Sequence, residues 1–200
     1  MVLNWGGVGN VTYLGADGPL AFDTGPANAL LDDFLMKRRG VAFDEGGALA
    51  ATGRVHAARL DAMMGDPYFD RPGPKSLDRN HFAGAADQVA DLDDADGAAT
   101  LGAFTIEATA AALKILPQAP RRWLVGGGGR RNRFLMEKLA ARLGVPVEPV
   151  EAVGYDGDAI EAQLFAYLAI RSRLGLPLSF PTTTGVPAPM SGGVFWPGGT

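Results

Sequence analysis

Two glycine-rich segments, residues 4–10 and 125–132, restrict the fold of this chain more than any other feature of its sequence. The first lies between two short apolar runs at the N-terminus, and the second joins an apolar run to an amphipathic helical pattern. Glycines at such junctions let backbone N–H groups approach a ligand that no residue with a Cβ atom would admit. The segments therefore predict either a nucleotide held from two sides or two tight turns in a glycine-rich protein.

The composition of the 200-residue chain is that of one domain with a sizeable core. Its 22 acidic residues exceed its 18 Lys and Arg residues, which form no long run, and this argues against nucleic acid as a partner. Cysteine is absent, which excludes disulfides, a thiolate nucleophile and a Cys-ligated metal. His56 and His81 are isolated and predict no metal site.

The chain has no apolar run of about 20 residues, the length that spans a bilayer. Its first residues have neither the basic start nor the long apolar stretch of a signal peptide. We therefore expect a cytoplasmic protein without a membrane partner.

The first 40 residues predict hairpins followed by a helix. Three short strands are predicted at 1–4, 10–14 and 20–23, and turns this short permit only antiparallel pairing. Pro26 suits the first turn of a helix, which Gly40 ends.

The remainder alternates helices with two further strands. The pattern predicts a helix in two pieces over 41–64, a weak helix or connection over 83–96, and helices over 97–116, 132–143 and 158–174. It predicts strands over 121–125 and 147–150. A loop is predicted over 66–82 and an extended tail over about 176–200. Three antiparallel strands followed by strand–helix units predict an α/β fold with a mixed sheet flanked by helices, because such units have parallel neighbours.

Five short motifs of the chain resemble those of a known family. They are the segments 4–10, 23–28, 66–69 with 74–76, 127–129 with Asn132, and 157–158 with 161–162. The order of elements resembles one lobe of the actin-like ATPases, whose ribonuclease H-like lobes clasp ATP between them. The order and approximate spacing of the motifs resemble the anhydro-N-acetylmuramic acid kinases over essentially the whole chain.

The resemblance implies a sugar kinase that uses ATP and Mg²⁺. The family phosphorylates 1,6-anhydro-N-acetylmuramic acid, opens its anhydro ring with water and yields the 6-phosphate for peptidoglycan recycling. A small amino-sugar substrate and a homodimer follow as expectations. By resemblance, the residues near ATP are Asn4, Gly6, Gly7, Asn10, Gly127, Gly128, Gly129 and Asn132, and those toward the sugar are Asp23, Asn28, Lys75, Arg79 and Glu161.

The family's first phosphate loop and its water-activating aspartate both lie ahead of the first glycine segment, where this chain begins. Phosphoryl transfer needs phosphates held in line with a positioned nucleophile. Residues 1–200 are therefore expected to form a C-terminal lobe with no catalytic residue or metal ligand of its own, little turnover alone and an exposed apolar face. The alternatives are a non-catalytic nucleotide-binding or interaction module and an actin-like kinase of another substrate.

The residues of the second glycine segment also have a purely structural interpretation. Gly127–Gly129 suit close packing of a helix on a strand, and Arg131 stands where a dinucleotide fingerprint needs its last glycine. Trp5 occupies a position where the family has an aliphatic residue, and it is expected to crowd the hairpin. The positions predicted to lie in the core by periodicity are Phe34, Leu35, Leu113, Leu116, Leu164, Phe165 and Leu168.

Structural interpretations also exist for the charged candidates. Asp158 and Glu161 have the spacing of a capping box at a helix start. Asp23 suits a turn, and Lys75 suits a solvated loop. The acidic run 91–96 predicts a solvated connection and a helix N-terminus rather than a calcium loop.

Overall fold

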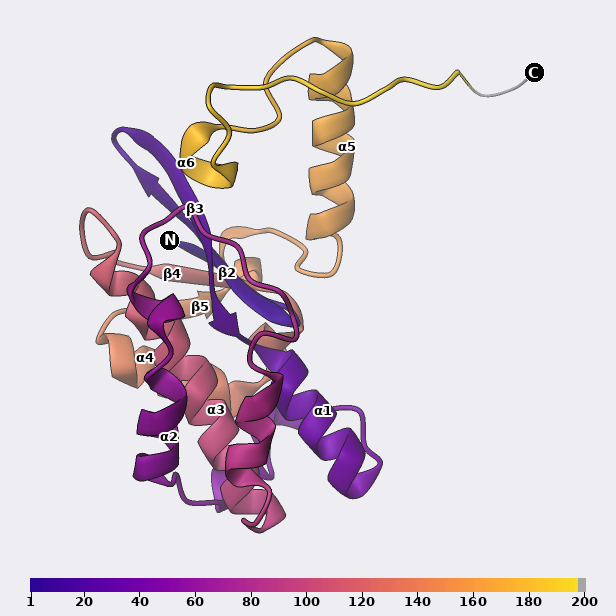
Figure 1. Cartoon of the computed structure of the whole chain (residues 1–200). Helices are drawn as coiled ribbons and strands as arrows, with labels where there is room; N and C mark the ends of the chain where they lie inside the picture. The colour runs from indigo at the N-terminus through magenta and orange to yellow at the C-terminus, as the bar shows by residue number, and fades with distance from the viewer. Residues whose placement is uncertain (198–200) are drawn as a thin grey trace.

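Five strands form one mixed sheet in the order β3-β2-β1-β4-β5 in this computed structural model, which describes residues 1–197 (Figure 1). The strands are β1 (Val2–Trp5), β2 (Val8–Gly15), β3 (Gly18–Pro26), β4 (Trp123–Gly126) and β5 (Val147–Pro149). β1, β2 and β3 pair antiparallel, whereas β4 is parallel to β1 and β5 is parallel to β4. The predicted α/β fold with a mixed sheet flanked by helices is confirmed.

The parallel pairing of β1 with β4 positions the two glycine-rich segments. Leu3 lies opposite Val125 and Asn4 lies opposite Gly126. The carboxyl ends of parallel strands meet at the same edge of a sheet, where ligands of open α/β sheets commonly bind. The turns that follow β1 and β4 are therefore neighbours.

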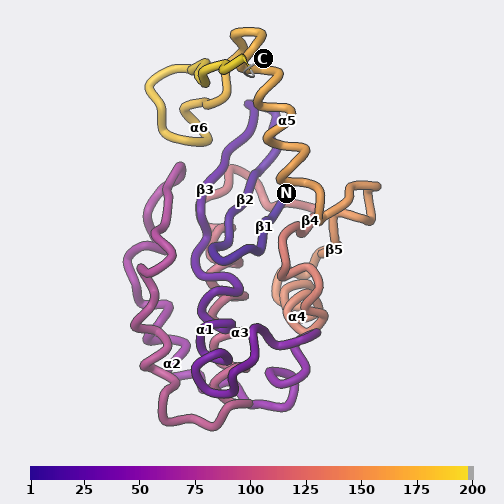
Figure 2. The backbone as a smooth tube through the Cα atoms, turned by 90° about the vertical axis from the view of Figure 1, so that its right-hand side faces the viewer, coloured from indigo at the N-terminus to yellow at the C-terminus, as the bar shows by residue number. Residues whose placement is uncertain are grey.

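Helices α1 to α4 lie together below the sheet in the view of Figure 1, α5 and α6 lie above it, and Figure 2 shows the same division from the side. The helices are α1 (Asn28–Arg39), α2 (Ala57–Met64), α3 (Asp94–Ala111), α4 (Arg133–Leu143), α5 (Ile160–Arg173) and α6 (Pro181–Thr184). α3 is central and contacts α1, α2 and α4. Asp93 caps its N-terminus by accepting a hydrogen bond from Asp96 N at 2.8 Å.

Apolar side chains of the sheet and of the lower helices form the core. The fully buried side chains of β1 and β4 are Leu3, Trp5, Trp123 and Val125. Phe34 and Leu35 of α1 are also buried, as predicted. Leu113 and Leu116, which follow α3, are partly buried against the sheet cluster.

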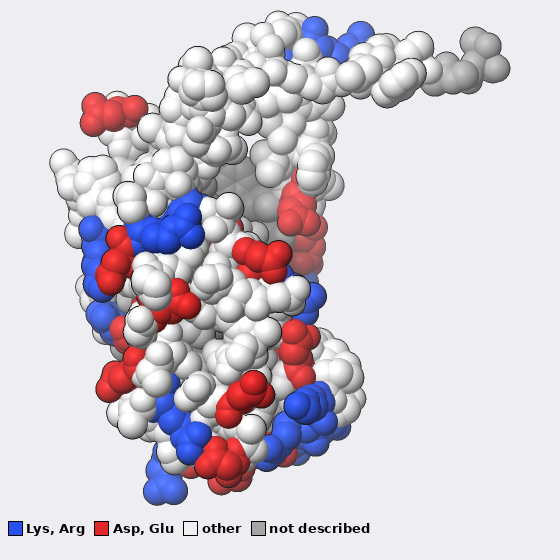
Figure 3. All heavy atoms as spheres, viewed as in Figure 1, with Lys and Arg blue, Asp and Glu red and all other residues white. Residues whose placement is uncertain are grey.

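The predicted core positions in α5 are wrong. Leu164 and Phe165 are 50% and 68% exposed, Leu168 is half-buried, and no residue of α5 is buried. Periodicity shows which side of a helix is apolar but not whether anything covers it. Figure 3 shows a mostly uncharged surface over α5, α6 and the tail, in contrast to the mixed charges over the lower helices. An exposed apolar face, as expected, is therefore present on α5.

The segment before α2 is not helical as predicted. Of the residues 41–64, only 57–64 form an α-helix. The Asp44 carboxylate accepts hydrogen bonds from the backbone N–H groups of Leu49 and Ala50, both at 2.9 Å. These bonds stabilise short 3₁₀ turns instead of a continuous helix.

The predicted tail is only partly extended. It contains α6 and an antiparallel bridge between Ser179 and Met190. The last positions of the predicted tail, 198–200, lie outside the described residues. Within residues 1–197, no helix combines the length and the apolar character needed to cross a bilayer.

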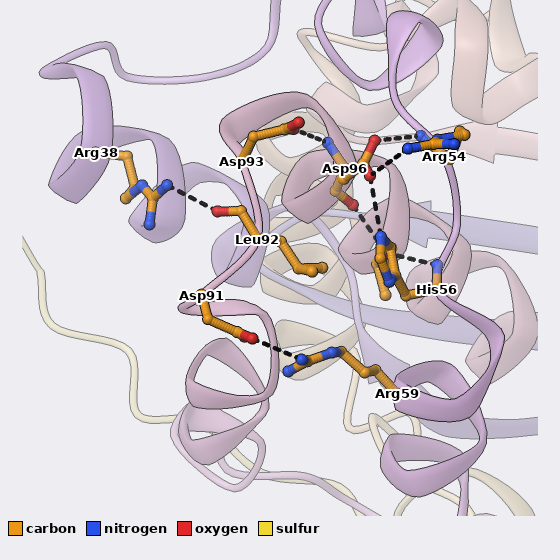
Figure 4. Close-up of polar contacts among 9 residues, drawn as sticks. Arg38, Arg54, His56, Arg59, Asp91, Leu92, Asp93 and Asp96 are labelled. Atoms are coloured by element: carbon orange, nitrogen blue, oxygen red, sulfur yellow. Dashed lines mark hydrogen bonds and ion pairs between the residues drawn. The ribbon is translucent and has the colours of Figure 1, made fainter.

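Acidic residues at the start of α3 fasten the segment that precedes α2 (Figure 4). Asp96 accepts hydrogen bonds from Arg54 N at 2.8 Å and from His56 Nε2 at 2.9 Å. These bonds, the backbone one first, hold the pKa of the Asp96 carboxyl below its usual range. Arg59 adds an ion pair with Asp91 at 2.8 Å. His56 and the acidic run thus have a structural role.

Candidate functional site

The second glycine turn is packed directly against the end of β1. Gly127 has φ +72° and ψ 177°, a conformation that is essentially restricted to glycine. A Cβ atom on Gly127 would lie 2.5 Å from the Trp5 carbonyl oxygen and 2.6 Å from Asn4 Oδ1. A Cβ atom on Gly129 would lie 2.6 Å from Trp5 Cβ. The close-packing interpretation therefore holds for Gly127 and Gly129.

Gly128 has a different environment. A Cβ atom there would have Asn28 Nδ2, at 3.8 Å, as its nearest neighbour. Gly128 also lines two adjoining cavities, of about 550 Å³ and about 300 Å³. Packing does not require a glycine at this position, whereas access of a ligand to the backbone would benefit from one.

The larger cavity lies between α1, the segment 43–46 and the start of α4. Its lining residues are Asn28, Leu31, Asp32, Phe43, Asp44, Glu45, Gly46, Gly128, Arg131 and Asn132. Asn28 Nδ2 donates to the Trp5 carbonyl at 2.9 Å. Asn132 Oδ1 accepts from Leu135 N at 3.0 Å and caps α4. The cavity thus unites Asn28, expected near the sugar, with Gly128 and Asn132, expected near ATP.

The smaller cavity lies where the two glycine turns meet the start of α5. Its lining residues are Asn4, Gly6, Gly127, Gly128, Arg130, Arg131, Gly157, Asp158, Ile160 and Glu161. Glu161, expected near the sugar, therefore lies beside Asn4 and Gly6, which are expected near the ATP phosphates.

Asp158 does not form the predicted capping box. α5 begins at Ile160 after Ala159, with no side-chain cap. The Asp158 carboxylate instead pairs with Arg130 Nη2 at 2.7 Å and with the Arg131 guanidinium. These contacts, with Arg130 first, lower the pKa of the Asp158 carboxyl. Two guanidinium groups outcompete backbone N–H groups for the carboxylate because charge-assisted bonds are stronger.

Arg130, which the sequence offers together with Arg131 as a partner for a small anion, lies in this site although it is not among the predicted site residues. Its side chain is only 6% exposed and donates to the Gly127 carbonyl at 2.9 Å and to Glu151 Oε1 at 2.9 Å, as well as to Asp158. Arg130 therefore connects the glycine turn to the segment that leads into α5. The sequence does not predict the contact between Arg130 and Glu151, because Glu151 lies in a separate 3₁₀ turn.

Asp23 and Lys75 line a third cavity, of about 360 Å³, together with Asn10. Its remaining lining residues are Val11, Ala21, Phe22, Pro74, Ser76, Thr183 and Thr184. Asp23 Oδ2 accepts from Leu77 N at 2.7 Å, and Asp23 N donates to the Lys75 carbonyl at 2.9 Å. The Asp23 carboxylate thus fastens the loop 66–82 and does not form its own turn, so that alternative is wrong. Burial raises the pKa of this carboxyl.

Lys75 is buried, contrary to the interpretation of a solvated loop residue. It is 8% exposed, and its Nζ donates to the Tyr68 carbonyl at 2.7 Å. Nζ also lies 4.2 Å from the centroid of the Tyr68 ring. Burial, followed by the charge of Arg71, lowers the pKa of the Lys75 ammonium to about 8.

This pKa predicts how the stability of the chain depends on pH. Between about pH 8 and the ordinary lysine value of 10.5, unfolded Lys75 holds a proton that folded Lys75 has lost. The free energy of unfolding should therefore rise with pH across this window, by about 3 kcal/mol. Urea denaturation at several pH values should show this rise in the wild type and in the control Lys37→Met, which changes an exposed lysine. A rise that persists in Lys75→Met would contradict the prediction.

Three of the predicted site residues lie apart from these three cavities: Gly129, which is packed against Trp5, Arg79 and Gly7. Arg79 Nη2 forms an exposed ion pair with Asp33 at 3.0 Å. The Gly7 carbonyl accepts from Ala27 N at 3.1 Å and from Ala29 N at 3.3 Å, at the start of α1. None of these three residues lines the cavities described above. Gly7 thus connects the hairpin to α1.

Asp32 is the second residue of this site that is not among the predicted site residues. It lines the larger cavity one helical turn after Asn28, so both side chains lie on the same face of α1. Burial, followed by the charge of Asp33, raises the pKa of its carboxyl to about 6. The four-residue spacing from Asn28 was the available signal, because a motif residue on a helix implies that its i+4 neighbour faces the same ligand.

The residues around Gly128 fit a nucleotide better than a bare metal. The two cavities share the lining residues Gly128 and Arg131, so they lie on either side of the second glycine turn's exposed backbone. Among residues 1–197, no group of three or more His, Asp or Glu side chains is arranged to hold a metal ion. Mg²⁺ usually needs only one or two protein carboxylates besides phosphate and water, so its binding with a nucleotide does not depend on such a group.

The family described as anhydro-N-acetylmuramic acid kinase matches residues 1–198. A relative of that name from Rhodospirillum rubrum is 58% identical over 201 residues, which cover 100% of this chain and 53% of the relative. Those from Acidiphilium cryptum and Nitrobacter winogradskyi are 58% and 53% identical over 96% of this chain, and the matches cover 54% and 53% of their own lengths. The chain spans about half the length of the curated relatives it matches.

Proposed function

The chain belongs to the anhydro-N-acetylmuramic acid kinase family, and we propose on this basis that it supplies the nucleotide-side lobe of a sugar kinase. The complete kinase transfers the terminal phosphoryl group of ATP to the 6-oxygen of 1,6-anhydro-N-acetylmuramic acid. Water adds across the anhydro bond, and the products are ADP and N-acetylmuramic acid 6-phosphate. The reaction takes place in the cytoplasm, during peptidoglycan recycling, and the kinase is a homodimer.

The observation that carries this proposal is the family match over residues 1–198, in a chain whose two glycine turns are neighbours. The adenosine of ATP occupies the larger cavity, beside Asn28, Gly128 and Asn132. The phosphates extend into the smaller cavity, where backbone of the two glycine turns and Arg131 face them. Mg²⁺ enters with the phosphates and neutralises part of their charge.

The sugar lies beyond the phosphates in this proposal. Glu161 shares the smaller cavity with Asn4 and Gly6, which supports assigning its carboxylate as the acceptor of a hydrogen bond from a sugar hydroxyl next to the phosphates. Asn10, Asp23 and Lys75 stay together in the third cavity. We assign them to the substrate side of the lobe, and Arg79 to its exposed margin.

We expect the isolated chain to bind ATP and to show little or no turnover. The reason is that one lobe cannot by itself enclose the phosphates in line with an activated water. Calorimetric titration with ATP and Mg²⁺ measures the first property, and a coupled assay with ATP, Mg²⁺ and the anhydro sugar measures the second. The matched control joins the unmatched half of the Rhodospirillum rubrum relative to this chain, and it should turn over the anhydro sugar.

Three results would contradict the proposal in different ways. Robust turnover by the chain alone would remove the need for a second lobe. ATP binding without turnover in the joined protein would favour a non-catalytic binding module. Turnover of another sugar or acid, but not of the anhydro sugar, would indicate a different actin-like kinase.

A further inference from the structure

The larger cavity has acidic walls. Asp32, Asp44 and Glu45 line it, and the guanidinium of its one lining arginine, Arg131, is paired with Asp158. Phosphate groups carry negative charge and are disfavoured where carboxylates outnumber cationic groups, as they do here; in the smaller cavity the two arginines Arg130 and Arg131 balance Asp158 and Glu161. A neutral part of a ligand that donates hydrogen bonds is favoured there instead. The cavity therefore suits a nucleoside rather than a phosphate chain.

The carboxylates of the cavity differ in whether they already accept hydrogen bonds from the protein. Asp44 accepts hydrogen bonds from Leu49 N and Ala50 N. The Asp32 carboxyl has no hydrogen-bond partner among the residues that the structure describes, although it is half-buried. Its neighbour Asp33 is largely exposed and pairs with Arg79 instead. Asp32 is thus a half-buried acceptor that is left available to a ligand.

An unpaired, half-buried carboxylate lowers the stability of a protein unless something donates to it. Burial acts against the ionised form of Asp32, which raises its pKa to about 6. At neutral pH, folding therefore partly buries an ionised carboxylate to which no residue among 1–197 donates a hydrogen bond, and this lowers the free energy of unfolding. Groups that a fold keeps at such a cost are often found where a ligand binds.

The inference that follows rests on the proposed function, because it assumes that ATP is the ligand. We propose that Asp32 recognises the nucleoside by accepting a hydrogen bond from one of its donors, a ribose hydroxyl or the 6-amino group of adenine. An ionised carboxylate is an acceptor only and forms a charge-assisted bond with such a donor. Phe43, which is 60% exposed and lines the same cavity, supplies apolar surface for the base.

Calorimetric titration of the 200-residue chain tests this assignment with four Mg²⁺-bound nucleotides: ATP, 2′-deoxy-ATP, 3′-deoxy-ATP and ITP. Asp32→Ala should weaken ATP binding by about 10- to 100-fold, which corresponds to one charge-assisted hydrogen bond. The control Asp33→Ala removes the neighbouring carboxylate of the same helix, outside the cavity, and should bind ATP like the wild type. The nucleotide that lacks the recognised donor should bind the wild type and Asp32→Ala equally well.

The outcomes separate this inference from the proposed function. If the wild type bound ATP and Asp32→Ala bound it with the same affinity, the role of Asp32 would be overturned, whereas the proposed function would stand. An equal loss of affinity for all four nucleotides would also overturn it, since no single donor would then be recognised. Absence of ATP binding by the wild type would overturn the proposed function and this inference together. Because both substitutions remove an unpaired, half-buried carboxylate, Asp32→Ala and Asp32→Asn should keep the melting temperature at or above the wild-type value, so misfolding would not explain a loss of affinity.

Discussion

Replacement of Gly127 by alanine should lower the free energy of unfolding by about 3 kcal/mol and abolish ATP binding. Two physical effects add. The backbone of Gly127 has φ +72° with ψ 177°, which disfavours any side chain, and the new methyl group would overlap the Trp5 carbonyl oxygen at 2.5 Å. Because that carbonyl also accepts the hydrogen bond of Asn28, relief of the overlap would displace a wall of the larger cavity. Urea denaturation and calorimetric titration with ATP measure the two effects.

Gly128→Ala is the matched control for this substitution. Its added methyl group has no heavy atom nearer than 3.8 Å, so stability should change by less than about 1 kcal/mol. The methyl group would nevertheless enter the space that both cavities share, and ATP affinity should fall. Equal stability losses in the two variants would show that the second glycine turn is not packed against β1 as described.

Truncation of Trp5 should have a large effect on the stability of the sheet. Trp5 is fully buried, and its Nε1 donates to Thr109 Oγ1 of α3 at 3.1 Å. Trp5→Ala would leave a large cavity between β1 and α3 and cost about 4 kcal/mol of the free energy of unfolding. Chemical denaturation followed by far-UV circular dichroism measures this cost.

Trp5→Phe separates the packing of the indole from its hydrogen bond. Phenylalanine keeps most of the buried apolar surface and loses the bond to Thr109, whose hydroxyl still donates to the Thr105 carbonyl at 2.9 Å. We expect a cost of about 1–2 kcal/mol for this variant. If Trp5→Phe were as unstable as Trp5→Ala, the hydrogen bond rather than the packed volume would dominate.

The position of Trp5 shows why an expectation drawn from its neighbours in sequence was wrong. Its size is expected to crowd the hairpin, yet the ring is buried under the sheet, where the absence of a side chain at Gly129 leaves room for it. That room is created by the second glycine turn, far away in the chain. Hairpin residues alone contain no information about it.

The contacts of the charged residues predicted for the site also depended on the tertiary structure. The spacing of Asp158 and Glu161 is correct for a capping box, but Arg130 and Arg131 take the Asp158 carboxylate. Lys75 has the sequence surroundings of a solvated lysine, but the loop buries it against Tyr68. In each case a partner distant in sequence competes with the local interaction, and the stronger charge-assisted bond or the burial decides the outcome.

The sequence by itself determined the mixed α/β sheet, the C-terminal ends of α1 and α4 and the family, because periodicity, turn residues and motif spacing act over short stretches of chain. The predicted start of α1 was wrong, because Pro26 is the last residue of β3. Only the tertiary structure decided that the two glycine turns touch and that α5 stays uncovered. These features depend on which distant segments meet. Contacts of that kind are set by the packing of the whole sheet and its helices, and no local pattern encodes them.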